Sequence, residues 1–202
     1  MTRVTRLDAV ALVGNPRPGS RTAALASAVL GAVLTRLGAE PVGEVSRADG
    51  TLIDLGALLA TSGAPLGEGS GERYAEPLAR LHAARLAVVA TPTYKGSYTG
   101  LLKSFLDHVA AGALRRTVAV PVITVGSPAH TLAADVHLRP LLVELGAVLP
   151  TAALVVAERD LADPTAVIGA WLDGAEPALR ALLAPSPVAE PPAEPVAAEV
   201  GA

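Results

Sequence analysis

The 202-residue sequence has no cysteine, few aromatic residues and no strong excess of either charge. Without cysteine, the chain can form no disulfide bond, thiolate metal site or catalytic thiol. A net charge of −3 without a basic block is not typical of nucleic-acid-binding proteins, and no apolar run reaches the roughly 18 residues of a membrane span. The N-terminus also lacks the long apolar core and cleavage site of a signal peptide. We therefore expect a soluble, cytoplasmic protein with no nucleic-acid or membrane partner.

Short apolar runs alternate along the chain with longer segments of helical period. Four runs are nearly continuous, as expected for parallel strands covered on both faces. They occupy residues 7–14, 85–92, 117–126 and 147–157. A weaker strand is predicted near 41–46.

Apolar residues at steps of three and four predict helices between and after these strands. The four stripes run over residues 25–37, 98–109, 132–145 and 171–182. The repeated strand–helix order predicts an α/β fold with an open, doubly wound parallel sheet. Five strands fit the flavodoxin-like order 2-1-3-4-5, with helices on both faces forming a three-layer sandwich.

One domain is expected over residues 1–184. Within it, the glycine-rich segment 56–76 is predicted to be a mobile loop. Residues 185–202 include five prolines and three glutamates. Because this composition buries too little apolar surface to fold, we predict a disordered tail.

Ligands of such sheets bind at the carboxyl ends of the strands, so three loops carry the functional prediction. The first, residues 14–25, reads GNPRPGSRTAAL. Ser20 and Thr22 offer hydroxyls at a helix start, while Arg17 and Arg21 add positive charge. With the N–H groups of the helix start, this loop is suited to a phosphate monoester. The alternative is an ordinary capped helix, since serine and threonine are favoured there in any case.

The second loop and the helix that it opens contain two of the three tyrosines and both lysines of the chain. The segment, residues 91–107, reads TPTYKGSYTGLLKSFLD. Tyr98 and Phe105 fall on the helical stripe and are expected in the core. Tyr94 and Lys95 precede that stripe, so packing does not explain them. Backbone N–H groups of this turn would lie across the crevice, where they could hold a flat heteroaromatic ring.

The third loop, residues 125–130, reads VGSPAH. Gly126 permits close approach of a ligand to the backbone, and Ser127 can donate a hydrogen bond. His130 is more typical of a helix start than of a catalytic residue. Because the four histidines of the chain show no HExxH or HxH spacing, no metal site is predicted.

Three stretches, in this order and at these spacings, resemble the NADPH-dependent FMN reductase family: GNPRPGSRT, TPTYKGSYTGLLKSFLD and VGSPAHTLAADVHLRPLL. The likeness is closest to the small reductases that supply reduced flavin to alkanesulfonate monooxygenases. It covers roughly residues 8–157, and its most specific part is the pattern TPxYKxxYxGxLKxxLD. The resemblance implies a flavodoxin-like fold, FMN as cofactor or substrate, NADPH or NADH as hydride donor, and a homodimer or homotetramer. No catalytic side chain is implied, because the protein needs only to position the two ring systems for hydride transfer.

The resemblance also implies roles for individual residues. The FMN phosphate would be bound by Arg17, Ser20 and Thr22, with Arg21 beside them. The isoalloxazine ring would be lined by Pro92, Thr93, Tyr94 and Lys95 and, from the other side of the cleft, by Gly126 and Ser127. Two departures concern the phosphate loop. Asn15 replaces a usual serine, and Pro16 and Pro18 each remove an N–H donor, so a modest phosphate affinity is predicted.

The sulfonate-type reductases resemble one another in an extra residue that creates a π-bulge in their fourth helix, at the subunit interface. Here that region reads DVHLRP, residues 135–140. Val136 or His137 stands at the place of the extra residue. Since π-bulges often mark functional sites, both are candidates for an interface role.

Three functions are open at this point. The first is an NAD(P)H-dependent FMN reductase that supplies reduced flavin to a partner flavin-dependent monooxygenase, of the sulfonate or sulfur assimilation type. The second keeps FMN bound and reduces quinones, azo dyes or chromate. The third is a non-catalytic flavodoxin-type electron carrier, which the missing acidic face and the tyrosine–lysine turn disfavour.

Overall fold

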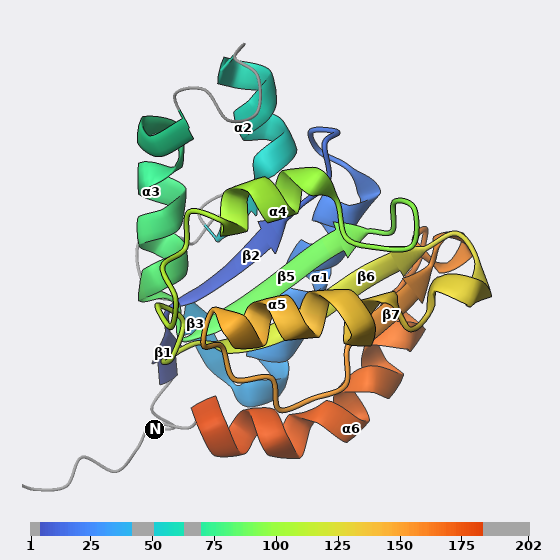
Figure 1. The fold of residues 1–202 in the computed structure, drawn as a ribbon. Helices are drawn as coiled ribbons and strands as arrows, with labels where there is room; N and C mark the ends of the chain where they lie inside the picture. Colours follow the sequence, from blue (N-terminus) through green and yellow to red (C-terminus); the bar gives the residue numbers. More distant parts are fainter. Residues whose placement is uncertain (1–4, 42–50, 63–69, 184–202) are drawn as a thin grey trace, which may run out of the picture.

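A five-stranded parallel sheet forms the centre of the protein (Figure 1). The computed structural model describes residues 5–41, 51–62 and 70–183. The strands follow the spatial order β4 (Leu52–Asp54), β2 (Ala9–Val13), β5 (Leu86–Pro92), β6 (Val118–Val125) and β7 (Leu154–Ala157). Numbered one to five along the chain, these strands have the order 2-1-3-4-5. Two further strands, β1 (Thr5–Leu7) and β3 (Ala39–Pro41), pair with each other in a separate small sheet.

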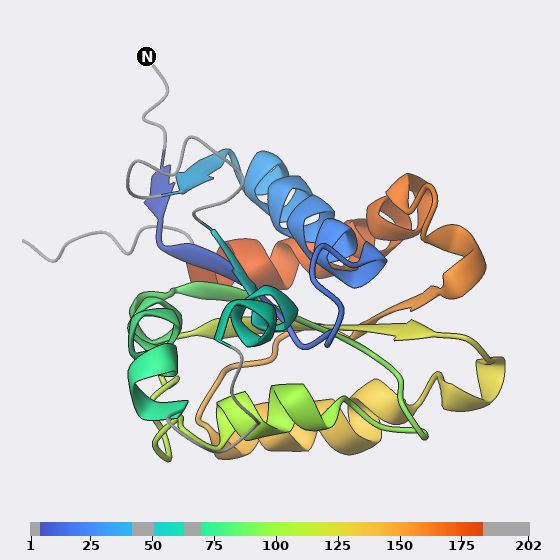
Figure 2. The same ribbon diagram turned by 90° about the horizontal axis from the view of Figure 1, so that it is seen from above.

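Helices cover both faces of the sheet (Figure 2). One face carries α1 (Arg21–Leu37) and α6 (Thr165–Leu183), and the other carries α3 (Ser70–Ala83), α4 (Gly100–Leu106) and α5 (Arg139–Glu144). Successive residues along a strand point to opposite faces of the sheet. Ala11 and Val13 of β2 belong to the core under α1, and Val10 and Leu12 belong to the opposite core. Because both faces are buried, the central strands are apolar at nearly every position, which explains the continuous runs in the sequence.

Helix α1 begins and ends at residues that are typical of helix caps. Ser20 caps its first turn by accepting a hydrogen bond from the N–H of Ala23. Gly38 ends the helix in the left-handed conformation, with φ of 65°, and donates its N–H to the last carbonyls. Glycine adopts this conformation without the steric cost that other residues bear. Of the helices in the described ranges, none is long and apolar enough to cross a membrane.

The second strand of the sheet lies elsewhere than the sequence predicts. Of the predicted strand 41–46, Pro41 belongs to β3, and 42–46 lie outside the described residues. The second strand is Leu52–Asp54 instead. Three residues are too few for a periodic pattern, so apolar runs do not reveal it. The run 147–157 is also only partly a strand: β7 begins at Leu154, and Val148 makes an isolated bridge to Val118.

Helices occupy the described parts of the segment 56–76, where a mobile loop was predicted. Helix α2 spans Leu55–Ser62 and α3 begins at Ser70, so the loop prediction is wrong there. Residues 63–69 lie outside the described residues. The loop prediction is based on the glycine content of this segment, but Gly56 lies in the capped first turn of α2. The predicted tail, 185–202, also lies outside the described residues, and its disorder stays a prediction.

Candidate functional site

The three predicted loops meet at the carboxyl edge of the sheet. The first joins the second through Gly14, whose N–H donates to the carbonyl of Ala90 at 2.8 Å. The hydroxyl of Thr99 donates to the carbonyl of Gly14 and closes the same junction. The second loop joins the third through Thr93, whose N–H and hydroxyl both donate to the carbonyl of Thr124, each at 2.9 Å. Segments far apart in sequence are therefore fixed to one another at this edge.

Asn15 closes the first loop into a compact ring. It is buried, its side-chain amide donates to Thr22 Oγ1 at 3.0 Å, and its Oδ1 accepts from the N–H of Arg17 at 3.0 Å. Thr22 is also buried, so its hydroxyl is turned to this internal bond rather than to solvent. In the sequence, Asn15 stands out only as a departure from serine, and its role in holding the loop is not evident there. Its one signal is that asparagine readily bonds to nearby backbone N–H groups in turns.

Several donors at the start of α1 have no acceptor within the described residues. The backbone N–H groups of Ser20, Arg21 and Thr22 make no hydrogen bond there. The guanidinium groups of Arg17 and Arg21 have no ion-pair partner in the described ranges, and both residues are exposed. Three consecutive N–H groups and two cations at a helix N-terminus form the donor set that a phosphate requires.

A tight turn forms the second loop. The N–H of Tyr94 donates to the carbonyl of Ser97 at 2.9 Å, and the N–H of Ser97 donates back at 3.2 Å. Lys95 and Gly96 between them have φ of 52° and 80°, the signs expected of a type I′ turn. Of the described non-glycine residues, only Lys95 has positive φ. A lysine held in this conformation costs of order 1 kcal/mol, so the turn carries local strain.

The hydrogen bonds of this turn change the predicted way of holding a ring. The N–H groups of Thr93 and Tyr94 are already donated to carbonyls, so of the predicted residues 93–95 only Lys95 keeps an N–H without an acceptor in the described part of the chain. Tyr94 is 45% exposed, and Pro92 at the end of β5 is half-buried. Phe105 is buried in the core, as predicted.

Two threonines missed by the sequence analysis fix the start of α4. Thr99 is buried and caps the helix, its hydroxyl accepting from the N–H of Leu102 at 3.1 Å. Its own N–H donates to Thr91 Oγ1 at 3.2 Å. A threonine before an apolar helical stripe is a capping signal in the sequence, but its bond to Gly14 cannot be read there.

The third loop borders a cleft of about 380 Å³ between the ends of β6 and β7. Gly126 and Ser127 line it together with Glu158 and Asp160. Ser127 Oγ accepts from the N–H of Ala129 at 3.3 Å and caps a short 3₁₀ turn. At Gly126, an added Cβ would lie 3.7 Å from the Glu158 carboxyl carbon, so this carboxylate stands close to the predicted ring-binding backbone.

A π-helical segment precedes α5. It spans Ala134–Leu138 and so contains both Val136 and His137. Val136 is 59% exposed, and Leu132 before it is 67% exposed. The local irregularity lies where the family resemblance implies it, and its place at a subunit interface stays a prediction.

Comparison with known proteins identifies the family of the chain. The family described as NADPH-dependent FMN reductase matches residues 7–161. The chain belongs to this family. NADH-dependent FMN reductase SfnE of Pseudomonas putida is 34% identical to it over 163 residues, which cover 79% of this chain and 81% of the relative. SfnF of Pseudomonas fluorescens (strain Pf0-1), also named an NADH-dependent FMN reductase, is 37% identical over 160 residues, 78% and 80% of the two chains.

Solved structures of similar fold include two oxidoreductases. The apo form of the NADH:FMN oxidoreductase EmoB has a TM-score of 0.66 and 33% identity, covering 92% of both chains. An oxidoreductase from Corynebacterium diphtheriae has a TM-score of 0.67 and 26% identity, covering 90% of this chain and 98% of its own. The flavodoxin-like fold and the family resemblance are thereby confirmed. The protein is an oxidoreductase, and the family implies FMN and a nicotinamide nucleotide as its reactants.

The residues present fit the phosphate end of FMN. A phosphate monoester carries close to two negative charges at neutral pH, and the start of α1 offers two guanidinium groups and three N–H donors that have no partner among the described residues. Riboflavin and other uncharged flavins would leave this set without an acceptor. The first loop therefore has the charge and donors that the FMN phosphate would require, and its role in binding FMN stays a prediction.

Proposed function

We propose that this protein reduces FMN with a nicotinamide nucleotide and releases the reduced flavin to a partner flavin-dependent monooxygenase of sulfonate or sulfur assimilation. The observation that carries the proposal is the donor set at the start of α1. Arg17, Ser20 and Arg21 would hold the phosphate through side chains and backbone N–H groups. FMN, when bound, supplies the ring that accepts hydride from the nicotinamide.

Around the isoalloxazine ring, the residues of the chain would act only by positioning the ring. Tyr94 and Lys95 would cover one edge of the ring from a turn that is held by two hydrogen bonds. Gly126 would let the ring approach the backbone of the third loop. No acidic or basic side chain is needed for hydride transfer between two stacked rings.

Release of the flavin is favoured by what the first loop lacks. Between residues 15 and 19, Pro16 and Pro18 have no N–H, and the N–H groups of Arg17 and Gly19 are donated to protein carboxamide and carboxylate oxygens. Only the groups from Ser20 onward remain for a phosphate. An incomplete cradle lowers FMN affinity, as a flavin that must leave after each turnover requires.

NADH is proposed as the better hydride donor. The relatives that cover about four fifths of the chain are named NADH-dependent. The cleft beside the third loop carries the carboxylates of Glu158 and Asp160. These charges would repel the extra phosphate of NADPH if that end of the nucleotide lay in the cleft. Comparing kcat/KM for the two nucleotides tests this assignment, and a preference for NADPH would contradict it.

A homodimer or homotetramer is proposed on the face of the π-helical segment. Leu132, Val136 and Val143 are each 59% or more exposed there. An apolar row of this kind is stabilised when a second copy covers it. Light scattering of the wild type and of the Val136→Asp variant tests the assembly, and a wild-type monomer would contradict it.

The central test is the dependence of turnover on free FMN. The purified protein should carry little flavin, and NADH oxidation should rise and saturate as FMN is added. Adding a flavin-dependent monooxygenase of the sulfonate type should then couple NADH oxidation to substrate oxygenation. A preparation that stays yellow and reduces quinones at a rate independent of added FMN would refute release of the flavin.

A further inference from the structure

Asp54 connects the phosphate loop to a different part of the fold. It is the last residue of β4 and lies directly before α2. Its Oδ1 accepts from the N–H groups of Gly56 at 2.9 Å and Ala57 at 3.3 Å, which caps that helix. Its Oδ2 accepts from the N–H of Gly19 at 2.9 Å, across 35 residues of sequence. One carboxylate thus holds the start of α2 and the phosphate loop together.

A second contact shows how closely these two segments approach. An added Cβ at Gly56 would lie 2.5 Å from the carbonyl oxygen of Asn15 and 2.9 Å from the carbonyl carbon of Arg17. Both distances are far inside van der Waals contact. The backbone of the loop therefore lies against the first turn of α2 with no room for even a methyl group.

The position of Gly19 gives this contact a consequence for binding. Gly19 has φ of 59° and directly precedes Ser20, the first of the three residues whose N–H groups lack an acceptor within the described chain. Glycine has no Cβ and can adopt many backbone conformations unless its N–H is held. A hydrogen bond to a carboxylate is about twice as strong as one to a neutral acceptor. Fixing Gly19 therefore fixes the direction of the donors that follow it.

We propose that Asp54 is a positioning residue for the FMN phosphate. Its carboxylate orients the N–H groups of residues 20–22 through Gly19 and has no contact with the flavin itself. This inference rests on the proposed function, because it concerns the same phosphate site. The opposite effect of Asp54, repulsion of the phosphate by its charge, predicts tighter binding when the charge is removed, so the two effects have opposite signs in an experiment.

The Asp54→Asn variant separates the two halves of the contact. Its amide oxygen can still cap α2, but its NH₂ group cannot accept from Gly19. We expect FMN affinity to fall about tenfold, the size of one lost hydrogen bond, with riboflavin affinity unchanged. The Gly56→Ala variant, which pushes on Asn15 and Arg17, should show the same selective loss. Both affinities are measured by titration with flavin fluorescence.

Asp163→Asn is the matched control. Asp163 accepts a hydrogen bond from the N–H of Thr165, the first residue of α6, at 3.2 Å. Since neither residue belongs to the first loop, this variant should bind both flavins as the wild type does. Asp54→Asn binding FMN as well as the wild type or better, or losing both flavins equally, would overturn the role of Asp54. A wild type that binds FMN and riboflavin equally would instead overturn the phosphate site itself, and the role of Asp54 with it.

Discussion

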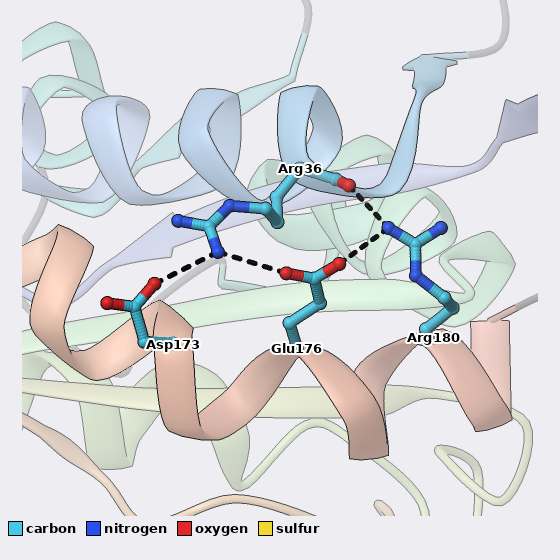
Figure 3. A network of polar contacts seen from close by, with 4 residues as sticks. All are labelled: Arg36, Asp173, Glu176 and Arg180. Atoms are coloured by element: carbon cyan, nitrogen blue, oxygen red, sulfur yellow. Dashed lines mark hydrogen bonds and ion pairs between the residues drawn. The ribbon is translucent and has the colours of Figure 1, made fainter.

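Both ends of helix α1 carry arginine, but within the described residues only the arginine at the C-terminal end forms ion pairs. At the C-terminal end, Arg36 forms ion pairs with Asp173 at 3.1 Å and Glu176 at 2.9 Å (Figure 3). Arg180 donates to the other oxygen of Glu176 at 2.7 Å and to the carbonyl of Arg36 at 2.6 Å. The hydrogen bonds to Glu176 and Asp173 raise the pKa of Arg36. These contacts join α1 to α6, and they place positive charge where the helix dipole favours it.

The N-terminal end of α1 differs both in ion pairing and in the placement of charge relative to the helix dipole. Arg17 and Arg21 lie at the positive end of the dipole, where a cation is disfavoured, and within the described chain neither has a carboxylate partner. This end is held by neutral hydrogen bonds from Asn15 and Thr99 and by the bond from the N–H of Gly19 to Asp54, and no ion pair in the described chain contributes. Residues that conflict with local stability are expected at functional sites. The contrast supports the proposal that the C-terminal charges stabilise the fold, whereas the N-terminal charges bind the phosphate of FMN.

The largest expected effect comes from removing a charge at the N-terminal end. Arg17→Ala should weaken FMN binding by roughly 1.5–3 kcal/mol, the range of a charge-assisted hydrogen bond, and leave thermal stability unchanged. Arg36→Ala is the control on the same helix: it should lower the melting temperature and leave FMN binding alone. Flavin titration and thermal unfolding of both variants test the contrast. Equal FMN affinities for the two variants would break it.

A second prediction concerns the neutral bonds that hold the N-terminal end. Thr99→Val keeps the side-chain shape but removes the helix cap and the bond to Gly14, so the free energy of unfolding should fall by about 1–3 kcal/mol. Thr131→Val is the matched control, because the hydroxyl of Thr131 is exposed and donates only to the carbonyl of Pro128. Urea unfolding compares the two. A Thr99→Val protein as stable as the wild type would show that these hydroxyls do not hold the loop.

The strained turn provides a smaller test of the same contrast. Lys95→Gly relieves the cost of positive φ but adds freedom to the unfolded chain, so stability should rise by about 0.5 kcal/mol. Lys95→Ala removes the same side chain and keeps the strain, so it should be the less stable of the two variants. If Lys95→Ala were equally stable, the backbone conformation would carry no strain.

The smallest effect is expected at the C-terminal ion pairs. Hydrogen bonds from Arg180 and Arg36 lower the pKa of Glu176. A carboxylate with a lowered folded pKa stabilises the fold above its unfolded pKa, about 4.3, and loses that contribution as pH falls through the folded value. Glu176→Gln should therefore lower the melting temperature slightly at pH 7, with the difference from wild type vanishing in acid. A difference that persists below pH 3 would contradict this assignment.

Much of the scaffold follows from the sequence, because its signals are local. Continuous apolar runs place β2, β5 and β6, and the stripe from Leu25 with Ser20 at the helix start places α1. The positions of the three candidate loops follow from the rule that ligands bind beyond the carboxyl ends of parallel strands. Apolar runs do not predict the second strand of the sheet, because Leu52–Asp54 is too short to show a periodic pattern.

The hydrogen bonds that hold the candidate site in place cannot be predicted from the sequence, for a different reason. Asp54 reaches Gly19 across 35 residues, and Thr99 reaches Gly14 across 85. No spacing in the sequence indicates that these pairs meet, since the sheet brings them together. The N–H groups of Thr93 and Tyr94 are likewise occupied only because β5 and the turn fold as they do.

The measurement that tests the central claim most directly is the affinity of the wild-type protein for FMN and riboflavin, which differ only by the phosphate. If the N-terminal end of α1 binds that phosphate, FMN should bind at least about tenfold more tightly, and rising salt should reduce the difference. Equal affinities at low salt would contradict the claim that Arg17, Arg21 and the first turn of α1 form a phosphate site.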